Sequence, residues 1–255
     1  MRRVRVIPVL LIHKGGLYKT VQFDKPKYVG DPINAVKIFN EKEIDEIVVL
    51  DIDASRQGRG PNFEQIAEIA SEAFIPLAYG GGITTIDEVK KLFFLGVEKI
   101  ILNHSAFHKP ALISEAANRV GSQSVVASID YKRNFFGKPV VYTSNGHEST
   151  KTDPISYARK VVELGAGEII LNNIERDGTY KGYDLDMVQK VSSALAVPVI
   201  ALGGASEPAD FRNAVRAGAS AVAAGSMFVF QRPHNAVLIS YPGPAILKKE
   251  IFDQI

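Results

Sequence analysis

One stretch of the chain occurs twice. Residues 74–103 read FIPLAYGGGITTIDEVKKLFFLGVEKIILN, and residues 196–226 read AVPVIALGGASEPADFRNAVRAGASAVAAGS. Each copy contains an apolar run, a glycine turn, a helical pattern and a second apolar run, which is the unit of an alternating β/α fold. A duplicated segment of this kind predicts two halves of one barrel. The offset is 122 residues throughout, between Pro76 and Pro198 (198 − 76), Gly81 and Gly203 (203 − 81), Gly96 and Gly218 (218 − 96), and Glu46 and Glu168 (168 − 46).

The whole chain fits a (β/α)8 TIM barrel with a two-fold half-barrel repeat. Its 255 residues match the usual size of that fold, and no linker rich in Pro, Gly and Ser divides it. We therefore expect a single domain over residues 1–255, with half-barrels at about 1–122 and 123–255. The expected strands are 4–11, 46–52, 75–79, 98–102, 125–130, 168–172, 197–201 and 220–224. The expected helices lie near 31–42, 62–73, 84–95, 109–119, 153–164, 184–194 and 206–217.

Three segments depart from the alternating pattern. Residues 13–30 are rich in Gly and Lys and predict a long loop that covers the carboxyl end of the barrel. Residues 131–150 contain an alternating run and an Asn-Gly turn, which predict a small hairpin. Beyond residue 228 three prolines argue against a long regular helix before about residue 245.

Composition excludes several classes of function. A formal net charge of +2 gives no polycationic surface for nucleic acid, and the absence of cysteine excludes disulfides, thiolate metal sites and a cysteine nucleophile. No apolar stretch approaches the ~20 residues that span a bilayer. We expect a cytoplasmic protein with no cofactor and no metal. His104 and His108 are four residues apart, but the nearby proline and the loop setting argue against a helical pair.

Glycine turns follow two repeat-equivalent strands and predict anion sites. Backbone N–H groups at such turns approach an oxyanion without a Cβ in the way, as in many phosphate sites. We call each such anion site a cradle. The first cradle is expected at Gly81, Gly82 and Asn103, and the second at Gly203, Gly204, Gly225 and Ser226 with Asp177 and Gly178 nearby. The alternative is that these glycines only permit tight turns. Because two pairs occupy matching positions, we favour phosphate or sulfate as the ligand.

Two charged residues near the expected strand ends are candidates for chemistry. Asp130 ends the buried strand 125–130, where a carboxylate needs either a partner or a chemical role. The alternative is a salt bridge to Lys132 or Arg133. Lys19 on the first loop has the reach to contact a ligand, although a single loop lysine is usually solvated.

Four charged residues begin strands at the opposite end of the expected barrel. They are Arg5, Glu46, Lys99 and Glu168. Each alone is consistent with a solvated strand terminus. Because Glu46 and Glu168 are repeat-equivalent, two acids and two bases are expected to meet there.

Across residues 3–228 the chain resembles the HisF family, the cyclase subunit of imidazole glycerol phosphate synthase in histidine biosynthesis. The resemblance rests on stretches that include Arg5-Val6-Ile7-Pro8, Gly80-Gly81-Gly82-Ile83, Ser128-Ile129-Asp130-Tyr131-Lys132-Arg133 and Arg176-Asp177-Gly178-Thr179. It implies a glutaminase partner (HisH-like) at the strand-start end of the barrel. It also implies that ammonia passes a gate formed by Arg5, Glu46, Lys99 and Glu168, and crosses the barrel to a ribonucleotide with two phosphates.

The resemblance also implies two catalytic aspartates, of which this chain has one. Asp130 matches the aspartate that ends strand 5, whereas Leu11 occupies the place of the aspartate that ends strand 1. Leucine transfers no proton, and general acid–base catalysis is typically worth roughly 10²–10⁴-fold in rate. His104 and Asn172 replace two expected threonines, so the departures concentrate at the expected chemistry.

This pattern is similar to a paralogous branch of the family linked to acetamidino sugar modification in surface polysaccharide (O-antigen-type) biosynthesis. The ending Leu238-Ile239-Ser240-Tyr241-Pro242 resembles that branch. The resemblance implies that a glutaminase and a cyclase-like barrel deliver ammonia to a third, ATP-dependent amidotransferase. The alternatives are an active cyclase of histidine biosynthesis, with His13 or water in place of the missing acid, and a related phosphoribosyl isomerase. The gate residues argue against an isomerase, which needs no ammonia.

Overall fold

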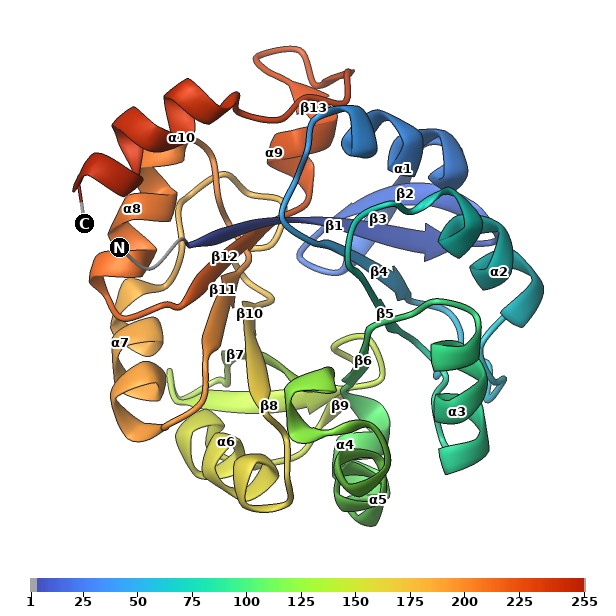
Figure 1. Cartoon of the computed structure of the whole chain (residues 1–255). Coiled ribbons are helices and arrows are strands. Elements are labelled where there is room, and N and C mark those ends of the chain that lie inside the picture. Colours follow the sequence, from blue (N-terminus) through green and yellow to red (C-terminus); the bar gives the residue numbers. More distant parts are fainter. Residues whose placement is uncertain (1–3, 255) are drawn as a thin grey trace.

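The computed structural model describes residues 4–254; residues 1–3 and 255, at the outer ends of the two expected half-barrels, lie outside the described part. Eight parallel strands close into a barrel, and helices surround it (Figure 1). The barrel strands are β1 (Arg5–His13), β4 (Ile47–Asp51), β5 (Leu77–Gly80), β6 (Lys99–Leu102), β7 (Val125–Arg133), β10 (Glu168–Asn173), β11 (Val199–Leu202) and β12 (Ala221–Ala224). Pairing of β7 with β10 and of β12 with β1 completes the ring, so the predicted (β/α)8 barrel is confirmed.

The strands are apolar throughout because both of their faces are covered. Side chains that point into the barrel form a separate inner cluster, which includes Ile7, Val48, Ala78, Val126 and Ile170. Those that point outward join the larger core beneath the helices. The inner cluster fills the middle of the barrel and separates its two ends.

The seven predicted helices are all present, with small shifts at their ends. Asp31 and Asp153 accept hydrogen bonds from the backbone N–H of Asn34 and Ser156 and thereby cap helices that begin with proline. These seven helices are α1 (Pro32–Glu41), α2 (Phe63–Glu72), α3 (Ile86–Phe94), α5 (Ala111–Val120), α6 (Pro154–Glu163), α7 (Leu185–Ala194) and α8 (Pro208–Arg216).

The predicted loop over residues 13–30 is wrong in its conformation. The segment forms a hairpin of β2 (Gly16–Val21) and β3 (Asp24–Gly30), and β2 pairs antiparallel with the end of β1. The second predicted hairpin is confirmed as β8 (Pro139–Thr143) and β9 (Glu148–Ser149), and β8 pairs with the end of β7. Both extensions stand at the carboxyl end of the barrel.

Several short elements were not predicted. The helices α4 (His104–His108) and α9 (Ser226–Val229) directly follow β6 and β12, and the turns η1 (Ser122–Ser124) and η2 (Phe252–Gln254) are 3₁₀ helices. A small pair of strands, β13 (Phe230–Gln231) and β14 (Ala236–Val237), precedes α10 (Pro244–Glu250). The last helix begins at residue 244, in agreement with the position that the prolines indicated. Among residues 4–254 we find no helix with the length and apolarity needed to cross a bilayer.

The repeat extends to individual backbone contacts. A Cβ on Gly81 would lie 2.5 Å from the carbonyl oxygen of Asp51, and one on Gly203 would lie 2.7 Å from that of Asn173. Asp51 and Asn173 are themselves 122 residues apart (173 − 51). The two glycines also share positive φ values of 128° and 93°. Each glycine is therefore required by the close approach of the preceding strand end.

The helix that follows each glycine turn is capped in the same way. The Glu88 carboxylate accepts from the backbone N–H of Thr84 at 2.7 Å, and the Asp210 carboxylate accepts from that of Ser206 at 2.8 Å. The offset is again 122 residues (210 − 88). The duplication thus preserves the hydrogen bonds that begin α3 and α8.

We expect Gly81→Ala and Gly203→Ala each to lower the free energy of unfolding by about 2–5 kcal/mol. The expected loss is the sum of two costs: about 1–2 kcal/mol for a side chain in the left-handed backbone region and about 1–3 kcal/mol for overpacking. Gly15→Ala is the matched control, since Gly15 has φ 79° and open space at the Cβ position. Urea unfolding of the three variants measures the difference. Equal losses in all three would contradict the role of the backbone contacts.

Candidate functional site

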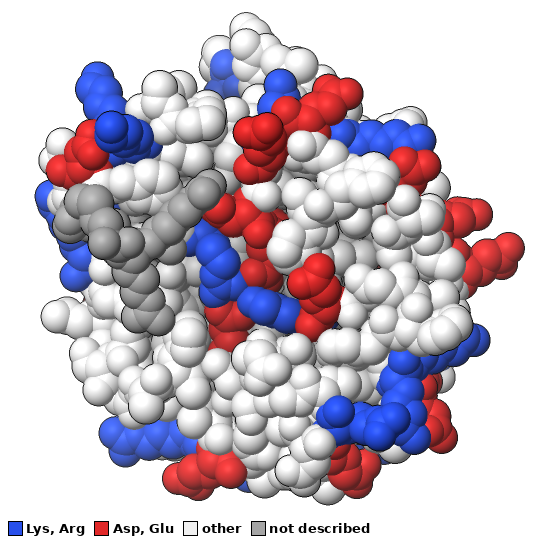
Figure 2. Space-filling model, viewed as in Figure 1, with Lys and Arg blue, Asp and Glu red and all other residues white. Residues whose placement is uncertain are grey.

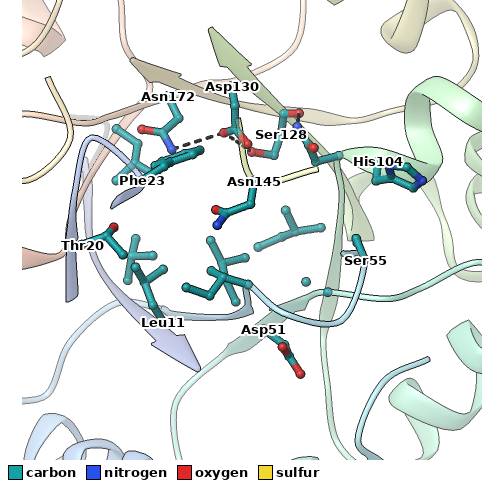
Figure 3. Close-up of a pocket in the computed structure, with 18 of the residues that line it drawn as sticks. Leu11, Thr20, Phe23, Asp51, Ser55, His104, Ser128, Asp130, Asn145 and Asn172 are labelled. Atoms are coloured by element: carbon teal, nitrogen blue, oxygen red, sulfur yellow. Dashed lines mark hydrogen bonds between the residues drawn. The ribbon is translucent and has the colours of Figure 1, made fainter. Parts of the chain in front are cut away.

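The main pocket opens at the carboxyl end of the barrel, between the two hairpins. Its empty volume, including the open mouth, is about 1020 Å³. Leu11 and Asp130, from the ends of β1 and β7, lie on opposite sides of it (Figure 3). The structure therefore brings together the two positions that the sequence comparison singled out.

Asp130 is buried and has no salt bridge to Lys132 or Arg133, so that alternative is wrong. Its carboxylate accepts hydrogen bonds from Asn172 Nδ2 at 3.2 Å and from Ser128 Oγ at 3.3 Å. Burial raises the pKa of Asp130 to about 7, with a smaller contribution from the negative charge of Asp177. The two hydrogen bonds act to lower the pKa, but by less than burial raises it. The carboxyl group can therefore exchange a proton near neutral pH.

Leu11 provides no such group on the opposite wall. It pairs with Leu50 on β4 and with Tyr18 on β2, and it packs against the inner apolar cluster. His13, the alternative acid, pairs instead with Asp53 through its Nδ1 at 2.8 Å. His13 does not line the main pocket, whose wall at this point is apolar.

Lys19 is buried rather than solvated. Only 3% of the residue is exposed, and its Nζ donates to the carbonyl oxygen of Val9. Burial lowers the pKa of Lys19 to about 8, against the attraction of Asp177. Burial raises the pKa of Asp177 to about 6, against the charge of Lys19 and a hydrogen bond from Thr20. Hairpin β2–β3 thus places an ammonium group in the pocket wall.

The first predicted cradle lines the pocket, but its side chains already have partners. Gly81 and Gly82 have φ values of 128° and 71° and reach the pocket surface. The side-chain amide of Asn103 donates to the carbonyl oxygens of Ser128 at 3.0 Å and Tyr142 at 3.4 Å. This cradle can therefore bind a ligand through its backbone N–H groups rather than through the side-chain amide of Asn103.

The second predicted cradle reaches the pocket only in part. Gly225, Ser226 and Asp177 line it, and Lys19 Nζ lies 2.9 Å from the position of a Cβ on Gly225. The remaining glycines of this cradle, Gly178, Gly203 and Gly204, are not part of the pocket lining. A Cβ on any of these three would meet backbone atoms, so close packing alone accounts for them.

Sequence reasoning missed the contribution of the second hairpin. Asn145, in the turn between β8 and β9, reaches toward the middle of the pocket (Figure 3). The Asn-Gly pair predicts a turn but not the direction of the Asn145 side chain. Phe23, in the turn between β2 and β3, also lines the pocket and closes it from the opposite hairpin.

The argument against a helical histidine pair is wrong. His104 and His108 are the first and last residues of α4, and their ring centroids lie 4.2 Å apart. Burial lowers the pKa of His104, and the neighbouring His108 adds to this effect. The short helix begins directly after β6, which turns His104 to the edge of the pocket (Figure 3).

Four charged residues form a closed ring at the strand-start end. Arg5 donates to both Glu46 and Glu168, and Lys99 Nζ lies 2.9 Å from Glu46 Oε2 and 2.8 Å from Glu168 Oε2. We call Arg5, Glu46, Lys99 and Glu168 the ion ring. Figure 2 shows acidic and basic side chains gathered at the centre of the barrel mouth. Burial alone would lower the pKa of Arg5, but the hydrogen bonds and charges of the two glutamates raise it above its ordinary value.

The fold and its two ends define a class: a (β/α)8 barrel with a carboxyl-end pocket and an ion ring at the other end. The family model described as "Histidine biosynthesis protein" matches residues 5–233. The chain therefore belongs to this family, and within it is HisF-like.

Relatives support this assignment over nearly the whole chain. The chain is 53% identical over 243 residues to "Putative imidazole glycerol phosphate synthase subunit hisF2" of Pseudomonas aeruginosa. The aligned region covers 95% of this chain and 97% of that protein. It is 48% identical to the similarly named hisF3 of Vibrio vulnificus, over 98% of this chain and 97% of that protein. It is 41% identical to "Imidazole glycerol phosphate synthase subunit HisF" of Alkaliphilus metalliredigens, over 88% and 89% of the two chains.

We expect Asp130→Asn to stabilise the protein at pH 8 and to have less effect at pH 5. The folded-state pKa of about 7 lies above the ordinary 3.8, so the folded protein binds the proton more tightly. The wild-type free energy of unfolding therefore falls as pH rises from about 4 to about 7, by up to about 4 kcal/mol. Urea unfolding at several pH values measures this, with Asp24→Asn as the control for removal of an exposed carboxylate. Parallel curves for Asp130→Asn and wild type would contradict the raised pKa.

Proposed function

We propose that this chain is the barrel subunit of a glutamine amidotransferase complex. A HisH-like glutaminase docks at the ion ring, and ammonia crosses the barrel to the carboxyl-end pocket. From there a third, ATP-dependent amidotransferase uses it to amidate a sugar in surface polysaccharide biosynthesis. The chain's own cyclase activity is lost. This proposal rests on one observation. The ion ring is complete at one end of the barrel, whereas at the other end Leu11 lies opposite Asp130.

The ion ring supports ammonia entry at the strand-start end. Its two cations and two anions alternate around the barrel axis, and the glutamate side chains are only 4–5% exposed. In the described conformation the four side chains contact one another directly, so passage of ammonia requires at least one ion pair to open. Lys99 holds both glutamates through a single nitrogen, whereas Arg5 uses one guanidinium nitrogen for each, so Lys99 is the natural moving part.

The barrel interior supports the passage of a small neutral molecule. Between the ion ring and the pocket lie apolar side chains of the inner cluster, among them the small residues Ala78, Ala221 and Ala223. An apolar path favours ammonia over ammonium, because a charged group loses its solvation there. It also keeps the ammonia from protonation by water.

Leu11 supports the loss of cyclisation. A cyclisation that needs both an acid and a base requires two proton-transfer groups across the pocket, and Leu11 at position 11 of β1 transfers no proton. The glycine turns at Gly81 and Gly225, with the ammonium group of Lys19, still suit a phosphate or sulfate group of a ligand. Binding and catalysis are thus separable in this pocket. The numbered names hisF2 and hisF3 of two relatives are in keeping with a paralogous branch.

The alternative is an active cyclase subunit of imidazole glycerol phosphate synthase in histidine biosynthesis. One observation favours it. Asp177 also lines the pocket, and burial raises its pKa to about 6. Together with Asp130 it gives the pocket two carboxyl groups that titrate near neutrality. Under this alternative Asp177 supplies the proton transfer that Leu11 does not.

We expect the purified chain to show no turnover of the two-phosphate ribonucleotide substrate of the HisF family when ammonium salt is supplied. Ammonium removes the need for a glutaminase, so the measurement tests the pocket alone. Leu11→Asp is expected to recover part of the activity, since it restores a carboxyl group opposite Asp130. Asp177→Asn is the matched variant for the alternative. Strong wild-type turnover that Asp177→Asn abolishes would contradict the proposed loss and support the active cyclase.

We expect Lys99→Ala to change the glutamine-dependent rate of the assembled complex relative to its ammonium-dependent rate. Without Lys99 the two glutamates share only Arg5, so the ring loses one of its two cations. Breaking a fully buried ion pair costs about 3–5 kcal/mol of stability. The Lys99 side chain is 20% exposed, so we expect a smaller loss than this. Lys42→Ala, an exposed lysine at the end of α1, is the control. An unchanged ratio of the two rates would count against the gate.

A further inference from the structure

A cluster of three metal-ligating side chains lies at the rim of the pocket. His104 and His108 come from the two ends of α4, and Glu148 comes from β9. One ligand atom from each, a ring nitrogen or a carboxylate oxygen, lies within 4.8 Å of the other two. The three residues are up to 44 positions apart in the chain (148 − 104), so only the fold brings them together.

We propose that His104, His108 and Glu148 bind a divalent transition-metal ion of the zinc class. Two imidazoles and one carboxylate are a ligand set that zinc uses in catalytic sites, where a fourth position stays open to water or substrate. His104 lines the main pocket, so the open position would lie beside it. The site does not depend on the proposed function, because it rests on these three residues alone.

The distances are compatible with metal binding after a small closure. Zinc–ligand bonds of about 2.0–2.2 Å place tetrahedral ligand atoms about 3.3–3.5 Å apart. His108 Nε2 already lies 3.2 Å from Glu148 Oε2. The remaining closure is at most about 1.5 Å, estimated from the difference between the greatest separation here and the tetrahedral spacing. Both side chains have room for this movement, since 36% of His108 and 45% of Glu148 are exposed.

Neighbouring hydroxyl groups orient the ligands. Thr143 Oγ1 and Ser144 Oγ donate to Glu148 Oε2 at 3.0 Å and 3.2 Å. Ser144 Oγ also lies 3.0 Å from His104 Nδ1. A hydroxyl that donates its one proton to Glu148 must accept from His104, which fixes the Nδ1–H tautomer and leaves a lone pair on Nε2. Such outer hydrogen bonds are typical of metal sites.

Zinc chloride titrated into the metal-free full chain tests the proposal, with calorimetry as the readout. Wild type is expected to bind one equivalent. Since even partners beyond the ligands are worth about 10–100-fold in metal affinity, His108→Gln and Glu148→Gln should each bind at least about tenfold more weakly. Both positions are substantially exposed, so both variants are expected to fold. His147→Gln is the matched control, because His147 is an exposed histidine next to Glu148 that is not part of the cluster.

Cobalt chloride gives a second readout that depends on geometry. A tetrahedral site gives Co²⁺ strong visible absorption bands, which should appear with wild type and His147→Gln and be absent from the two cluster variants. Failure of wild type to bind zinc would overturn the proposal and leave a hydrogen-bonded surface cluster. So would binding that survives in both cluster variants, or binding that is lost in His147→Gln.

Discussion

The pairing of β7 with β10 fixes the relation between the two ends of the molecule. Its register places Glu168 opposite Val126 and Asn172 opposite Asp130. Glu168 belongs to the ion ring, whereas the Asn172 side chain donates to Asp130 in the pocket. At about 3.3 Å per residue the two β10 positions are ~13 Å apart along the strand. A slip of one residue would turn both side chains to the wrong face, so one ladder of backbone hydrogen bonds maintains both sites.

The repeat is preserved in the framework and altered at the pocket. Gly81 and Gly203 meet equivalent backbone carbonyls, and Glu46 and Glu168 occupy equivalent places in the ion ring. At the same offset, however, His104 corresponds to Ser226 (226 − 104 = 122). The side chains that begin α4 and α9 are therefore free to change, whereas Gly81 and Gly203 are not, because a Cβ on either would meet backbone.

Most of the framework could be predicted because it depends on local signals. Apolar runs, glycine turns and caps such as Asp31-Pro32 are readable over a few residues, and the repeat supplied a second copy of each. The helices α4 and α9 were missed because five and four residues are too few for a helical period. The hairpin β2–β3 has no sequence signature of a strand pair, because its second strand is largely exposed and carries no apolar alternation. The burial of Lys19 near Asp177 depends on contacts across 158 positions (177 − 19), which no local pattern encodes.

The proposed function assigns the pocket to ammonia delivery rather than to cyclisation. Delivery needs an apolar exit and a group that accepts a hydrogen bond or a proton. Leu11 and Leu50 supply the first and Asp130 the second, since all three line the pocket. The proposed loss of cyclisation rests on position 11, where the Leu11 side chain packs against the inner cluster and transfers no proton. Because Asp130 is held by Asn172 and Ser128 rather than by any β1 group, its geometry does not depend on which residue occupies position 11. The same fold can therefore lose its chemistry without losing its pocket.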